Sequence, residues 1–160
     1  MLGVHFAITA KQERALLAAD GDDDAVGEIL EELEESWADD RLKVDTDKAW
    51  DAMHRCLTDG TLYPDAGEYP LNHTVLGGRH LHEDCYVVHV GASEVRDVAV
   101  ALRGIDQAWL RTRFDAIDDP EYIGAGDDGD FEYTWENFVD VRDFYGRAAA
   151  AGRAVIFTAT

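Results

Sequence analysis

The stretch that decides the fold is AVIFTA, residues 154–159, a continuous apolar run late in the chain. Such a run predicts a strand buried on both faces, because a strand with one solvated face alternates apolar and polar residues. The segment GVHFAIT, residues 3–9, places Val4, Phe6 and Ile8 at alternate positions and holds little that is strongly polar. Both segments need burial on both faces, so we expect them to be neighbouring strands of one sheet.

Apolar residues recur every three or four positions through much of the remaining chain. This period predicts amphipathic helices that pack one face and expose the other. We expect them at about residues 11–19, 26–37, 93–102, 106–117 and 131–150. A further helix that contains Trp50 is expected to be capped by Asp45 or Thr46 and to end at Gly60.

The segments between these helices are less regular. Residues 85–90, CYVVHV, are rich in β-branched and aromatic residues and predict a third strand. The GAGDDGD segment, residues 124–130, has no apolar anchor and is expected to be a mobile surface loop. LNHTVL, residues 71–76, predicts a short helix ended by Gly77 and Gly78, and a hairpin across that glycine pair is the alternative.

Length and composition favour one domain. With 160 residues, 46% of them hydrophobic, the chain is long enough for one core and too short for two. We therefore predict a single compact α+β domain over residues 1–160. In it a small mixed sheet includes the N- and C-terminal strands and several helices cover that sheet.

The acidity of the chain excludes several classes of partner. Its 34 acidic and 14 basic side chains give a formal charge of −20, which repels nucleic acid and anionic membranes. No apolar run approaches the roughly 18 to 20 residues that span a bilayer, and the start lacks the pattern of a signal peptide, so we expect a cytoplasmic protein. Cys56 and Cys85 are too few and too far apart for a disulfide framework and are expected to be buried, reduced thiols.

Five segments of the sequence occur in an order and spacing that resemble those of a known family. They are GVHFAITA, DTDKAWDAMHRCLTDG, YPLNHTVLGGRHL, SEVRDVAVALRGID and FYGRAAAAGRAVIFTAT. Together they are similar to the YfbM-like family, small bacterial proteins that carry a domain of unknown function. The resemblance covers essentially the whole chain and implies a compact α/β-type domain of the cytosol. It implies no activity, cofactor or catalytic residue.

The chemistry-bearing side chains concentrate between residues 45 and 90, where both cysteines and five of the six histidines lie. His80, His82 and Asp84 stand two residues apart, and on an extended strand they would share one face, a spacing compatible with zinc or iron. His73 or His89 would complete the ligand set. A polar, partly exposed strand or turn is the competing interpretation, and the preferred prediction is that there is no metal site.

Three further patterns invite a functional interpretation. A thiolate nucleophile would form if a histidine met Cys56 or Cys85, although packing at the core edge explains the Cys56 helix more simply. Gly77, Gly78 and Arg79 form a turn that can hold a carboxylate or phosphate, or else a helix end followed by an arginine paired within the protein. Acidic residues at the start of the 131–150 helix are explained by the helix dipole, and we assign them no catalytic role.

Two functions follow from these patterns. The first is a small binding or interaction protein for a protein partner or small ligand, with no cofactor. Its predicted binding residues are Trp50, His54, Tyr69, His73 and Arg79. The alternative is an enzyme, either a metal-assisted hydrolase that uses His80, His82 and Asp84 or a transferase with Arg79 as an anion clamp.

Overall fold

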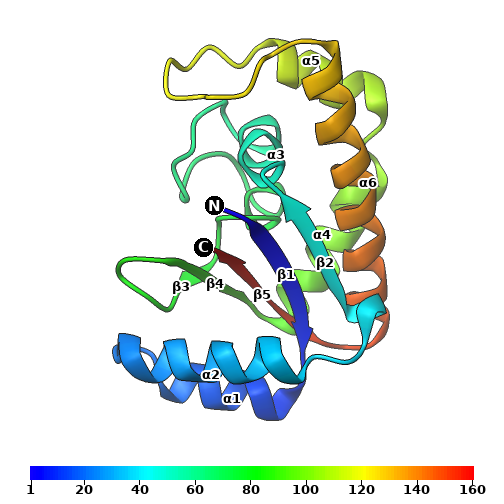
Figure 1. Cartoon of the computed structure of the whole chain (residues 1–160). Helices are drawn as coiled ribbons and strands as arrows, with labels where there is room; N and C mark the ends of the chain where they lie inside the picture. Colours follow the sequence, from blue (N-terminus) through cyan, green and yellow to red (C-terminus); the bar gives the residue numbers. More distant parts are fainter.

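The computed structural model describes residues 1–160 and is built around one five-stranded sheet (Figure 1). The strand order is β2-β1-β5-β4-β3, and every neighbouring pair is antiparallel. The bounds are β1 (Gly3–Ile8), β2 (Lys43–Asp47), β3 (Arg79–His80), β4 (Tyr86–Val90) and β5 (Ala154–Ala159). The predicted α+β class is confirmed, while the sheet is antiparallel throughout rather than mixed.

The two end strands are neighbours, as predicted. β1 and β5 pair along their whole length, from Gly3 opposite Ala159 to Ile8 opposite Ala154. All six residues of β5 are buried, since they alternate between two apolar layers. Val155 and Phe157 face the larger layer, and Ile156 faces the smaller one. A central strand with helices on both faces is what a continuous apolar run requires.

Helices cover both faces of the sheet unequally. α1 (Ala10–Ala18) and α2 (Asp23–Ser36) pack on one face, where Leu16, Val26 and Leu33 meet β1 and β5. The other face carries α3 (Trp50–Leu57), α4 (Ala92–Arg103) and α6 (Asp128–Ala150), and α5 (Gln107–Asp115) packs against α3 and α6. None of these helices combines the length and apolar character that crossing a bilayer requires.

The edge strand β2 is absent from the sequence-based prediction. Asp45 and Thr46 were expected to cap a helix, but they lie in β2, and α3 begins only after Ala49 with no side-chain cap. The misassignment has a local cause, because only Val44 and Thr46 of this short strand are buried and its other three residues are charged. Pairing with β1 stabilises the strand, and this long-range contact overrides the local propensity.

Three smaller expectations also change. The segment 124–130 is not a loop to its end, because Asp127 caps α6 and the helix begins at Asp128. Only the first half of the predicted 71–76 helix forms, as a 3-10 turn, Leu71–His73, and β3 starts directly after Gly78. Cys85 is exposed rather than buried, whereas Cys56 is buried as predicted.

Two backbone features near the end of β2 position the first turn of α3. Asp47 has a φ of 50°, a left-handed conformation in which aspartate is among the better-tolerated residues, and it turns the chain into α3. Gly3 of β1 lies against Trp50 so closely that a Cβ there would be 2.5 Å from the indole Cδ1. The first turn of α3 can therefore pack directly onto the sheet.

Candidate functional site

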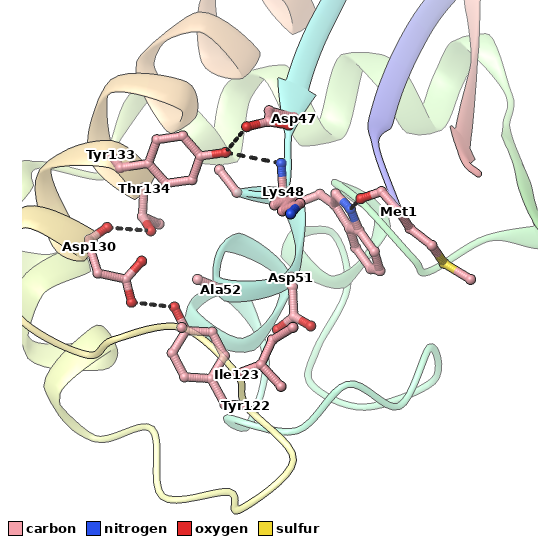
Figure 2. Close-up of a pocket in the computed structure, with 13 residues that line it drawn as sticks. Met1, Asp47, Lys48, Asp51, Ala52, Tyr122, Ile123, Asp130, Tyr133 and Thr134 are labelled. Carbon is pink, nitrogen blue, oxygen red and sulfur yellow. Dashed lines mark hydrogen bonds between the residues drawn. The ribbon is translucent and has the colours of Figure 1, made fainter.

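A cleft of about 510 Å³ opens where β2, α3 and α6 meet (Figure 2). Its walls are residues 47–49 at the end of β2, residues 50–52 in the first turn of α3, and residues 122–124 in the loop after α5. Asp130, Tyr133 and Thr134 of α6 and Met1 complete them. We call this feature the Asp47 cleft. Its volume is in the range typical of small-molecule sites.

Tyr133 orders one side of the Asp47 cleft. Its hydroxyl donates to Oδ2 of Asp47 at 2.7 Å and accepts from the backbone N–H of Lys48 at 3.0 Å. Burial, followed by the hydrogen bond to Asp47, raises the pKa of the Tyr133 phenol. The hydroxyl therefore stays protonated at neutral pH and fixes the carboxylate of Asp47.

A second phenol and carboxylate pair lies beside the first. The Tyr122 hydroxyl donates to Oδ2 of Asp130 at 2.6 Å, and the Gly126 N–H donates to the same oxygen at 2.9 Å. Burial, followed by the bond to Asp130, raises the pKa of Tyr122. The loop after α5 is thereby tied to the first turn of α6, and the carboxylates of Asp47 and Asp130 are oriented before any ligand arrives.

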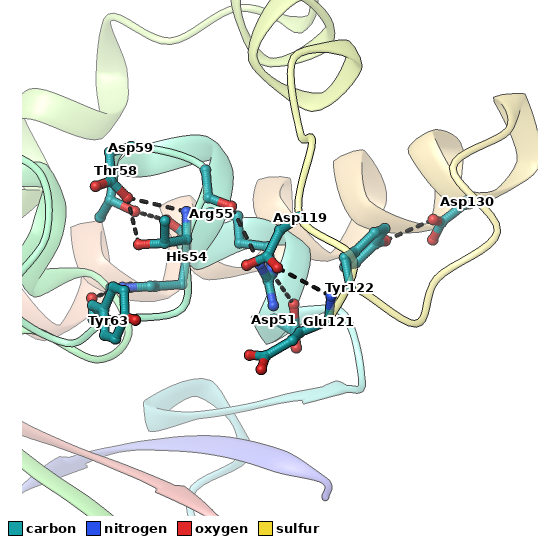
Figure 3. A network of polar contacts seen from close by, with 12 residues as sticks. Asp51, His54, Arg55, Thr58, Asp59, Tyr63, Asp119, Glu121, Tyr122 and Asp130 are labelled. Atoms are coloured by element: carbon teal, nitrogen blue, oxygen red, sulfur yellow. Dashed lines mark hydrogen bonds and ion pairs between the residues drawn. The ribbon is translucent and has the colours of Figure 1, made fainter.

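Behind the cleft, a buried arginine joins α3 to the same loop (Figure 3). The side chain of Arg55 is 1% exposed, and it contacts Asp51 Oδ1 at 2.7 Å and Asp119 Oδ2 at 2.6 Å. Its guanidinium also donates to the Gly60 carbonyl and lies 5.5 Å from the centroid of the Tyr122 ring. Arg55 therefore braces the wall that carries Tyr122.

Of the five predicted binding residues, Trp50 alone lines the Asp47 cleft. Its indole N–H donates to the Met1 carbonyl, and its ring packs against Tyr86 and Phe157. His54, on the same helix, is buried and contacts the Tyr63 carbonyl through Nε2 at 2.9 Å. Burial lowers the pKa of His54, so its imidazole is neutral at pH 7.

The other three predicted residues lie elsewhere. The rings of Tyr69 and His73 contact each other edge to face, with 4.9 Å between their centroids. The Tyr69 hydroxyl donates to Asp97 on α4 at 2.5 Å. Arg79 is half exposed and pairs with Asp20 at 2.5 Å. The structure therefore brings Tyr69 and His73 together but gathers the five residues into no single cavity, and a binding role for the last three stays a prediction.

The candidate metal ligands do not form a cluster. β3 ends at His80, so no single strand presents His80, His82 and Asp84. His80 contacts the Leu76 carbonyl at 2.8 Å, and His82 Nδ1 accepts from the backbone N–H of Asp84 at 3.1 Å. No group of three or more His, Cys, Asp or Glu side chains in the chain has a geometry suited to a metal ion.

Neither cysteine is arranged as a nucleophile with a histidine. Burial raises the pKa of the Cys56 thiol to about 12, which keeps it protonated at neutral pH. No histidine has a hydrogen bond to the thiol of Cys85; His82 Nδ1 accepts only from the Cys85 backbone N–H. His89 instead pairs with Glu13 at 2.7 Å.

Sequence reasoning missed the residues that shape the cleft, above all Asp47, Tyr122, Asp130 and Tyr133. Tyr133 and Asp47 lie 86 residues apart, so no local sequence pattern predicts their contact. The only local signals are Tyr122 and Tyr133, since a phenol in an acidic segment at the surface can donate a hydrogen bond to a carboxylate.

Comparisons with other proteins show what this chain resembles. The family profile described as "Domain of unknown function (DUF1877)" matches residues 1–158, which confirms the resemblance noted from the sequence. The crystal structure of YfbM from Escherichia coli, titled a protein of unknown function, is similar in fold with a TM-score of 0.74. It is 20% identical in sequence over 99% of each chain, a level that shows the fold alone. No curated protein matches the chain.

Proposed function

We propose that this chain, which belongs to the DUF1877 family, is a binding protein that takes a small organic molecule into the Asp47 cleft. The observation that carries the proposal is the preorganised wall. Two phenols hold two carboxylates in place across a concavity of about 510 Å³. A site whose polar groups are already oriented loses less entropy when a ligand binds, which raises affinity.

The lining supports binding rather than catalysis. It contains no Ser, Cys or His, and its one aliphatic hydroxyl, that of Thr134, donates to the Asp130 carbonyl at 2.9 Å. The two phenols are held protonated, so neither acts as a base at neutral pH. An aliphatic hydroxyl needs an adjacent base to act as a nucleophile, and that of Thr134 is bound to a backbone carbonyl instead.

A protein partner is the other form of the binding hypothesis. A concave cavity favours a small ligand, because protein interfaces of standard size bury on the order of 800 Å² per partner and are mostly flatter. The Ile123 side chain, 92% exposed at the rim, offers an apolar contact to a ligand larger than the cavity itself.

A fragment screen followed by amide NMR spectroscopy tests the proposal. We expect small organic fragments to shift the backbone amides of Lys48 and Ala49 and the indole N–H of Trp50. Tyr133→Phe should weaken this response, because it frees the Asp47 carboxylate and leaves the Lys48 N–H without its acceptor. If no fragment at millimolar concentration shifts these signals, the cleft is not a binding site.

Tyr69→Phe is the matched control for this screen. It removes the same hydroxyl from another tyrosine that donates to an aspartate, outside the Asp47 cleft. The fragment response should survive it. If Tyr69→Phe abolishes the response and Tyr133→Phe leaves it intact, the ligand binds at the Tyr69 and His73 contact and our choice of site is wrong.

A further inference from the structure

We propose that the Asp47 cleft selects organic cations, that is, a primary amine or guanidinium on an apolar or aromatic body. This inference deepens the proposed function and rests on it. It follows from three properties of the cavity wall taken together: the free carboxylate oxygens, the aromatic rings and the balance of charge.

Each of the three carboxylates that line the cleft has one committed and one uncommitted oxygen. Asp47 and Asp130 use Oδ2 for the tyrosine hydroxyls, and Asp51 uses Oδ1 for Arg55. The second oxygen of each has no partner within the chain. An ionised carboxylate is a pure acceptor with several lone-pair sites, so these free oxygens are matched by an N–H-rich cation.

Three aromatic residues also contribute to the lining. Trp50, Tyr122 and Tyr133 all line the cavity, and Figure 2 shows the Tyr133 hydroxyl directed at Asp47 and the Tyr122 hydroxyl directed at Asp130. The faces of such rings carry negative potential and attract cations, while the ring bodies accept apolar groups. Carboxylates and aromatic rings in one cavity therefore suit a ligand with a charged head and an apolar body.

The charge balance of the cleft disfavours anionic ligands. Three aspartates and one lysine line the cleft, which leaves a formal side-chain charge of −2 in its wall, or −1 with the α-amino group of Met1, and the whole chain carries −20. An anion would meet repulsion both at the wall and on approach, whereas a cation is attracted at both stages. Lys48, which is exposed, is the one lining side chain that opposes a cation.

The test uses three probes of similar size and different charge: 2-phenylethylamine, 2-phenylethanol and 3-phenylpropanoate. Each titration is followed through the NMR chemical shifts of the backbone amides of Lys48 and Ala49 and of the Trp50 indole N–H. We expect the amine to bind at least about 10-fold more tightly than the alcohol, since charge-assisted hydrogen bonds are roughly twice as strong as neutral ones. The carboxylate should bind most weakly. Added salt should weaken binding of the amine.

Variants with opposite expected effects sharpen this test. Asp47→Asn keeps a residue that tolerates positive φ and removes one charge, so it should weaken amine binding about 5- to 10-fold. Asp130→Asn provides a second variant in case the first unfolds. Lys48→Met removes the opposing charge and should tighten amine binding. Asp97→Asn is the matched control, because Asp97 also accepts a tyrosine hydroxyl but lies outside the cleft.

The outcomes separate this inference from the proposed function. Equal or tighter binding of the alcohol or the carboxylate at the cleft signals would overturn the cation inference and leave the binding function intact. An equal loss of amine affinity in Asp97→Asn and Asp47→Asn would also overturn it, because the overall charge alone would then explain the attraction. If neither these probes nor the fragments shift the cleft signals, both proposals fail together.

Discussion

Replacing Arg55 by methionine should destabilise the protein far more than the same replacement at Arg111. The two arginines make nearly the same contacts. Each pairs with an aspartate one helical turn away and with a second aspartate on another segment, and each lies over an aromatic ring. They differ in burial, since the Arg55 side chain is 1% exposed and that of Arg111 is 36% exposed.

The magnitude follows from what each change leaves behind. Removing one partner of a buried ion pair costs about 3 to 5 kcal/mol, because the remaining charge stays in a poorly solvated place. Asp51 and Asp119 are each 23% exposed and can regain part of their hydration, so we take about 3 kcal/mol for Arg55→Met. Arg111→Met should cost far less, because ion pairs at the surface contribute little to stability.

Urea unfolding monitored by tryptophan fluorescence measures both values. At about 2 to 4 °C per kcal/mol for a chain of this size, Arg55→Met should also lower the melting temperature by roughly 6 to 12 °C. Arg55→Lys should fall between wild type and methionine, because a compact ammonium cannot reproduce the planar fork that contacts both aspartates. Equal losses for Arg55→Met and Arg111→Met would refute the reasoning, since burial would then make no difference.

Four further outcomes are expected. Burial lowers the pKa of His5 to about 4, so the unfolded chain binds the extra proton first and stability should fall as pH drops from about 6.5 to 4. Calorimetry of His5→Phe should show a shallower fall, with a residual slope from His54, whose pKa burial also lowers. Phe157→Ala, in the larger apolar layer, should cost about 3 to 5 kcal/mol in urea unfolding, and a loss under about 1 kcal/mol would place that ring outside the core. Arg79→Gln should change stability by less than about 1 kcal/mol, because the ion pair of Arg79 with Asp20 is solvated. If inorganic phosphate raises the melting temperature of the wild type and not that of Arg79→Gln, the result would support the anion clamp instead. Sodium chloride should raise the melting temperature by screening repulsion within a chain of charge −20, and a fall would show that attractive pairs dominate.

The character of each element follows from local pattern wherever burial is regular. The apolar run 154–159 indicates a strand covered on both faces, and β5 is that strand. The 3.6-residue period likewise locates α2, α4, α5 and most of α6, because one face of each packs into an apolar layer. The prediction fails at β2, where a short edge strand with alternating charges has too little local signal and depends on its partner β1.

The candidate site shows the same division more sharply. The sequence alone determined the acidity, the burial of the end strands and the presence of Trp50 on a helix. Only the tertiary structure decided that Asp47 meets Tyr133 across 86 residues and that Arg55 meets Asp119 across 64. The reason is physical: periodicity records which face of an element avoids water, whereas a cleft is made by side chains of separate elements. Their approach depends on how the whole sheet and its helices pack.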